Sequence, residues 1–129
     1  MSYVEILHDV ESVFTTEDWT DNEIQAFPSS FAGVPATKEF IQIGTYPSQS
    51  NYRSFGSVNV AGYVGINIFT EKNVGDRRLF EIADILDDLL LSRIIGTLQF
   101  QTSLLNRAGS DIRYPLYNRG EYRINFREI

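Results

Sequence analysis

The sequence predicts a single α+β domain over residues 1–129, with one mostly antiparallel sheet of about four strands and two helices packed on one face. A period-two pattern of apolar and small residues predicts one long strand: Val58, Val60, Gly62, Val64, Ile66 and Ile68. After a short polar turn, apolar residues recur at helical spacing: Leu79, Ile82, Ala83, Leu86, Leu89 and Leu90. The predicted order is helix, strand, strand, helix, strand, strand, which favours the α+β class.

The first third of the chain predicts one helix followed by irregular structure. A Ser-x-x-Glu capping box occupies residues 2–5 and predicts a helix over residues 3–15. Turn-favouring side chains, together with Pro28 and Pro35, predict a mostly irregular segment over residues 16–37. We expect three aromatic residues to anchor this segment to the core: Trp19, Phe27 and Phe31.

The middle of the chain predicts a hairpin with a long tip. Residues 38–46 and 57–70 read as its strands, and residues 47–56 form a polar, turn-rich connection between them. Gly62 and Gly65 lie within the second strand, where a glycine indicates the close approach of a backbone or a bulky side chain.

The second half predicts one helix and two strands. The helix covers residues 76–93, and Gly96 is well placed to end it. A short strand at residues 97–101, a polar loop at residues 106–115 and a strand at residues 121–127 complete the chain. Alternation divides the last strand into a core face and an outer face: Tyr122, Ile124 and Phe126 against Arg123 and Arg127.

The composition excludes several classes of site. The chain has no cysteine, which excludes disulfides and thiolate metal sites. No apolar run approaches the roughly 18 residues of a membrane span, so we expect no membrane partner. The start of the sequence lacks the pattern of a secretion signal, and we therefore expect the protein to be made in the cytoplasm.

The net charge of −6 is unevenly spread along the chain. Residues 1–40 hold eight acidic residues and one basic residue, and residues 41–104 hold six and five. Residues 105–129 hold three acidic residues and five arginines. Such asymmetry is expected where one end of a subunit meets the other end of its neighbour. Uneven decoration of the surface explains the same charges without association, and the sequence leaves both interpretations open.

The candidates for chemistry are weak. His8 is the single histidine, and no Gly-x-Ser-x-Gly elbow accompanies it, so a Ser-His-Asp system is not indicated. The densest acidic group suggests either a cation or acid–base site or a solvated helix face, and we favour the latter: Glu81, Asp84, Asp87 and Asp88. The glycines match neither the dinucleotide nor the P-loop pattern. We predict no enzyme activity, no metal site and no cofactor.

Residue types enriched at protein interfaces gather in the two polar loops and on the last strand. We predict seven contact residues: Tyr52, Arg53, Phe55, Arg113, Tyr114, Arg123 and Arg127. Arginines also alternate with aromatic residues near the end of the chain, as in platforms for single-stranded nucleic acid. That alternative is disfavoured because Tyr122 and Phe126 fall on the core face and because the chain is acidic overall.

The order of these elements resembles the tail terminator proteins of long-tailed bacteriophages over nearly the whole chain. The similarity includes the N-terminal helix, the segment with Trp19, and a strand like residues 40–44. It continues through a long strand like residues 62–69 and through a glycine-containing turn into a helix like residues 79–86. Residues 70–73 are more charged than the small, Pro-Gly-rich loop that the family often carries there.

The resemblance implies a structural virion protein without catalytic activity. Such proteins form a six-membered ring that caps the tail tube, ends its polymerisation and offers the surface to which the DNA-filled head joins. The implied partners are other copies of the chain, the tail tube protein and a head–tail connector protein, and double-stranded DNA passes through the lumen without being read. The protein would be made in the host cytoplasm and end at the head-proximal end of the tail.

A ring built from heterologous contacts needs unlike patches, and we predict that Arg123 or Arg127 pairs with acidic residues of a neighbouring subunit. Three alternatives stay open. The chain could be another neck or head–tail completion protein, a small-ligand or metal-binding α+β enzyme built around the acidic helix, or a nucleic-acid-binding module.

Overall fold

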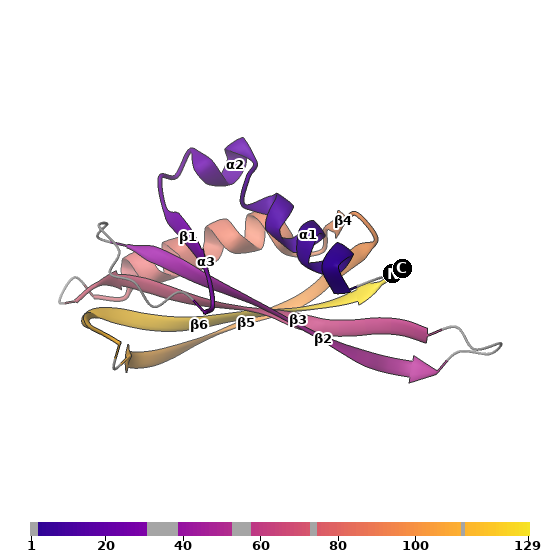
Figure 1. Cartoon of the computed structure of the whole chain (residues 1–129). Coiled ribbons are helices and arrows are strands. Elements are labelled where there is room, and N and C mark those ends of the chain that lie inside the picture. Colours follow the sequence, from indigo (N-terminus) through magenta and orange to yellow (C-terminus); the bar gives the residue numbers. More distant parts are fainter. Residues whose placement is uncertain (1–2, 31–38, 53–57, 73–74, 112) are drawn as a thin grey trace.

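The structure is a computed structural model, and it describes residues 3–30, 39–52, 58–72, 75–111 and 113–129. Three helices and six strands make up these ranges (Figure 1). The helices are α1 (Tyr3–Val13), α2 (Glu17–Thr20) and α3 (Arg77–Leu90). The strands are β1 (Gln25–Pro28), β2 (Phe40–Tyr52), β3 (Val58–Glu71), β4 (Ile94–Ile95), β5 (Leu98–Asp111) and β6 (Tyr114–Glu128).

All six strands belong to one mixed, curled sheet in the order β1-β2-β3-β6-β5-β4. The pair β1–β2 is parallel, and the other four pairs are antiparallel. The predicted sheet of about four mostly antiparallel strands with two helices was therefore wrong. The segment predicted to be irregular, residues 16–37, contains both α2 and β1. These elements and β4 are only two to four residues long, too short to produce a periodic pattern.

Three of the four central strands are longer than the sequence predicted, whereas β3 has its predicted length of 14 residues. β2 continues through the predicted polar connection as far as Tyr52, where it pairs with Val58 of β3. β5 likewise runs through most of the predicted second loop, residues 106–115, and ends at Asp111. Polar residues are tolerated in these strands because no helix of the described residues covers one face of the sheet and because cross-strand pairing outweighs intrinsic propensity. Both connections were assigned as loops from composition alone.

The helices lie on one side of the twisted sheet (Figure 1). α1 buries Ile6, Val10 and Val13, and α3 buries the apolar positions predicted from its spacing, except that Leu89 is only partly buried. The sheet meets them with alternate residues of its central strands: Val64, Ile66, Ile68, Tyr122, Ile124 and Phe126. This shared layer forms the main core, and the core face predicted for β6 is confirmed. No helix in the described part of the chain is long and apolar enough to cross a membrane.

Gly96 and Gly120 follow α3 in the chain, and neither ends the helix. The helix ends at Leu90 with Leu91 as its C-cap, so the prediction that Gly96 ends it was wrong. Gly96 instead lies between β4 and β5 with φ +59°, a left-handed conformation that glycine adopts without strain. Gly120 of β6 faces α3, where an added Cβ would lie 2.7 Å from both methyl carbons of Leu79.

Two contacts fix the segments that surround the core. Trp19 of α2 is 1% exposed and packs edge-on against Phe14, with 5.2 Å between ring centroids, so its predicted anchoring role is confirmed. At the start of α3, Arg78 donates to Glu39 through Nε at 2.8 Å and Nη2 at 2.6 Å. This hydrogen bonding to the Glu39 carboxylate raises the pKa of Arg78 and ties α3 to the start of β2.

The helix-free face of the sheet has a small apolar centre of its own. Phe40 and Phe69 stack with centroids 4.5 Å apart, and the Tyr114 ring lies edge-on to both. Phe27 and Tyr117 pack around them, and we call these five residues the aromatic cluster. Phe27 thus anchors β1 as predicted, whereas Phe31 falls outside the described residues.

Candidate functional site

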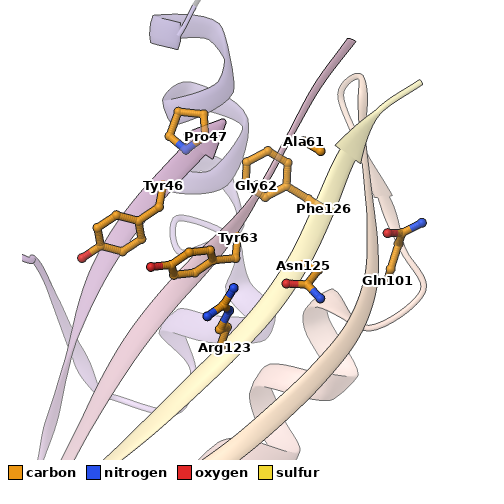
Figure 2. Close-up of a pocket in the computed structure, with 9 residues that line it drawn as sticks. All are labelled: Tyr46, Pro47, Ala61, Gly62, Tyr63, Gln101, Arg123, Asn125 and Phe126. Carbon is orange, nitrogen blue, oxygen red and sulfur yellow. The ribbon is translucent and has the colours of Figure 1, made fainter. Parts of the chain in front are cut away.

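Three side chains form a stack across the helix-free face of the sheet. Tyr46 of β2 and Tyr63 of β3 are directly paired in the register, and their rings stack with centroids 4.9 Å apart at 26°. The Arg123 guanidinium of β6 lies 3.7 Å from the centroid of the Tyr63 ring. Because β3 lies between β2 and β6, Tyr63 is enclosed between Tyr46 and Arg123 (Figure 2). We call Tyr46, Tyr63 and Arg123 the tyrosine–arginine row.

Glycines beside the row provide the space for its rings. Gly44 pairs with Gly65, and Gly65 pairs with Arg123 across the next strand. A Cβ at Gly44 would lie 2.7 Å from Cε2 of Tyr46, and a Cβ at Gly65 would lie 3.2 Å from the same atom. The Tyr46 ring therefore leans over two positions that carry no side chain. The prediction that Gly65 marks the close approach of a bulky side chain is confirmed.

A hollow of about 540 Å³ adjoins the row (Figure 2). Its lining includes the three row residues together with Gln101 and Asn125, and it contains no acidic residue. The Asn125 amide donates to Thr102 Oγ1 at 3.3 Å, which holds it at the rim of the hollow. The lining of the hollow thus offers phenol, amide and guanidinium groups, and it includes a cation but no carboxylate.

The outward residues of β6 differ in whether their charge is already paired. Arg119 donates to Glu121 at 3.0 Å, which neutralises that pair. Arg127 donates to the neutral amide oxygen of Gln99 at 3.3 Å, and Arg123 stacks on a tyrosine. Within the described residues, neither Arg123 nor Arg127 forms an ion pair. The prediction that these two arginines share the outer face of the last strand is confirmed.

Exposed carboxylates gather on the other side of the molecule, in the helical layer. Five exposed acidic residues form what we call the acidic lobe: Glu11, Glu17, Asp18, Asp21 and Glu23. None of the five forms an ion pair within the part of the chain that the structure describes. The positive charge of Arg123 and the negative charges of the acidic lobe therefore lie on opposite sides of the sheet.

The remaining predicted contact residues differ in where the structure places them. Tyr52 ends β2, and the placement of its side chain lies outside the described residues, as do Arg53 and Phe55 entirely. Arg113 is exposed, and its Nη2 donates to Gln42 Oε1 at 3.4 Å. Tyr114 is 5% exposed because it belongs to the aromatic cluster, so its ring is not offered at the surface. Its hydroxyl accepts a hydrogen bond from the buried Gln42 amide at 3.2 Å.

Neither Tyr46 nor Tyr63 is among the seven contact residues predicted from the sequence. The alternation of β3 does carry a signal, since Tyr63 falls between Gly62 and Val64, opposite the core face. What the sequence lacks is the register that brings residues 46, 63 and 123 together from three strands.

The acidic group on α3 divides between the outer face of the helix and the side toward the sheet. Glu81, Asp84 and Asp88 are exposed, which agrees with a solvated helix face. Asp87 turns toward the sheet, where its Oδ1 accepts hydrogen bonds from Tyr122 and Ser103, each at 2.7 Å. Burial, followed by the hydrogen bond to Asp87, raises the pKa of Tyr122. Within the described residues, no group of three or more His, Cys, Asp or Glu side chains could hold a metal ion.

Comparison with known proteins shows the fold and not the function. No protein family model matches the chain, and no curated protein matches it. A solved structure that carries no functional name aligns with 100% of this chain and 96% of its own, with a TM-score of 0.69 and 12% identity. This fold is therefore shared with an experimentally determined protein over its whole length. At that identity the likeness concerns the architecture alone.

Proposed function

We propose that this protein is a structural component of a phage tail that forms a ring, a hexamer of identical subunits, at the head-proximal end of the tail tube. The ring ends tube polymerisation and offers the surface to which a head–tail connector protein joins. Double-stranded DNA passes through its lumen without sequence-specific binding. The proposal extends the resemblance noted in the sequence, and it involves no catalysis.

The observation that carries the proposal is the reach of the sheet beyond its helices. β2, β3, β5 and β6 are 13 to 15 residues long, and the β2–β3 hairpin extends well past the helical layer (Figure 1). None of the described helices covers either face of that part of the sheet (Figure 1), so it offers two surfaces to other subunits. Long projecting hairpins add little to the core of a subunit, and they suit contacts in an assembly.

The mass and shape of the purified protein test the ring. Light scattering over a concentration series should detect a species of about 88 kDa, six times the subunit mass of 14.7 kDa, and negative-stain images should show rings. Tail tubes from a phage that encodes this chain should then acquire a cap at one end. Tubes that stay uncapped and continue to grow in the presence of the protein would refute a terminator.

Binding assays separate this function from another neck protein. A terminator binds the tube protein directly, whereas a head-side completion protein binds the connector and leaves the tube end free. The assay mixes the purified chain with tubes and with connector rings separately and measures co-sedimentation. Binding to connector rings alone would assign the chain to the head side of the neck.

A further inference from the structure

We propose that the tyrosine–arginine row is a docking surface for a second copy of this chain and that it receives carboxylates of the neighbour's acidic lobe. The inference rests on the proposed ring, and it names the two surfaces that meet between adjacent subunits. The row supplies a fixed cation, and the lobe supplies exposed anions that have no ionic partner within the described residues of their own chain.

The geometry of Arg123 prepares it for a carboxylate. The Arg123 guanidinium lies over the Tyr63 ring, 3.7 Å from its centroid, and Arg123 is exposed, so its N–H donors are available to a partner. Those donors match the two oxygens of a carboxylate. Because Tyr63 and Tyr46 already order the stack, little side-chain freedom is lost when a partner binds. The hollow beside Arg123 holds phenol and amide groups that can donate hydrogen bonds to the same acidic partner.

The placement of the two surfaces suits a ring. The row lies on the helix-free face, and the acidic lobe lies in the helical layer on the opposite side of the sheet (Figure 1). A contact between the row of one copy and the lobe of the next leaves one row and one lobe free at the ends. Such a heterologous contact can repeat from copy to copy, and the chain of copies closes into a ring when the rotation between neighbours is suitable. Two helix-free faces meeting about a twofold axis would instead bring two tyrosine–arginine rows together with no acidic lobe between them.

A nucleic acid is a weaker occupant for this surface. Base stacking requires free ring faces, and the Tyr63 ring is enclosed between Tyr46 and Arg123. Phosphate binding also requires a basic footprint, whereas Arg119 is neutralised by Glu121 and the chain carries a net charge of −6. The unpaired carboxylates of the acidic lobe match the cation better. DNA binding therefore enters the experiment as a competing outcome.

Charge reversal tests the contact between copies. One variant is Arg123→Glu, and the other carries Glu17→Lys and Asp18→Lys. Each variant alone should self-associate at least about tenfold more weakly than the wild type, because Arg123→Glu places a carboxylate against the acidic lobe and the double substitution reduces the net charge of the lobe from −5 to −1. An equimolar mixture should restore association, since a glutamate row then meets a lysine lobe and an arginine row meets an acidic lobe. Sedimentation velocity at low and high salt measures all four samples.

Control variants separate electrostatics from folding. Arg77→Glu reverses an exposed arginine at the start of α3 and should associate like the wild type. Arg123→Lys keeps the charge and should retain part of the association, which shows whether the planar stack is needed. Thermal unfolding of each sample confirms that the variants fold.

Four results would overturn the assignment. They are a wild type that stays monomeric at every concentration, variants that associate as well as the wild type, a mixture no better than its components, and salt-dependent binding of short DNA that Arg123→Glu abolishes. Failure of the proposed function is distinguishable from these. Rings that depend on Arg123 but do not cap tubes would refute the terminator and leave this contact intact, whereas capping that survives Arg123→Glu would refute the contact alone.

Discussion

Replacing Tyr122 by phenylalanine tests the hydrogen-bonded link between α3 and the sheet. Tyr122 is 2% exposed, and its hydroxyl donates to Asp87 Oδ1 at 2.7 Å. Ser103 Oγ donates to the same oxygen at 2.7 Å, so the carboxylate keeps one donor in the variant. A hydrogen bond to a charged group contributes about 1.5–3 kcal/mol to stability. Because Ser103 still donates to the carboxylate, we expect the variant to lose about 1–2 kcal/mol of the free energy of unfolding.

The size of this loss should depend on pH. Burial and the hydrogen bond to Asp87 raise the pKa of Tyr122 above the ordinary tyrosine value of about 10. Above that pH the phenol ionises in the unfolded chain but stays protonated in the folded one. The stabilisation is therefore fully present below about pH 10 and is lost as the pH rises further, at about 1.4 kcal/mol for each pH unit. The advantage of the wild type over Tyr122→Phe should shrink by about 1.4 kcal/mol between about pH 9 and pH 11.

Urea denaturation measures both effects. Trp19 is the single tryptophan and is 1% exposed, so its fluorescence reports unfolding. The control is Tyr3→Phe, a tyrosine on α1 that is 63% exposed and whose replacement should change the free energy of unfolding by less than about 0.5 kcal/mol at either pH. If Tyr122→Phe matches the wild type near pH 8, or if the difference between them stays constant up to pH 11, the reasoning about this link is refuted.

Three further substitutions address separate parts of the fold, each followed by urea denaturation. Gly120→Ala should destabilise by about 1–3 kcal/mol, because the new methyl group would lie 2.7 Å from both Leu79 methyl carbons, and an unchanged midpoint would contradict that packing. Arg78→Met should lower the free energy of unfolding by only about 0.5–1 kcal/mol, because solvent partly screens the ion pair between Arg78 and Glu39. Added salt should make the unfolding free energies of the variant and the wild type more similar. Phe69→Ala removes a ring that is 0% exposed from the aromatic cluster and should cost about 3–5 kcal/mol, a loss that a surface residue would not show.

Elements with a clear apolar period could be predicted from the sequence. The spacing of residues 79–90 identified α3 and most of its buried face, and alternation separated Ile124 from Arg123 on β6. These patterns are local, because the residues that share a face lie within one element. The α+β content followed from them, while the number of strands did not.

The remaining features depend on pairing between distant segments. Residues 47–52 are polar, and only the antiparallel partner β3 makes them a strand. Tyr114 looked like a surface contact from its loop-like surroundings, but the curled sheet brings it onto Phe40 and Phe69. The tyrosine–arginine row needs the register of three strands, and two of its members are separated from Arg123 by 60 residues or more. Composition and spacing carry no record of that register.

The outer edge of β2 limits how this sheet can be extended by other chains. Ser29 N–H donates to the Ile43 carbonyl at 2.9 Å on that edge, and alternation then turns Thr45 and Pro47 to the same side. Pro47 offers no N–H there, and β5 near the other edge is interrupted by register shifts. The missing N–H of Pro47 and the register shifts of β5 both oppose the addition of further strands, which is how open sheets grow into fibres. Association between copies of the chain is thereby left to side chains and not to backbone hydrogen bonds.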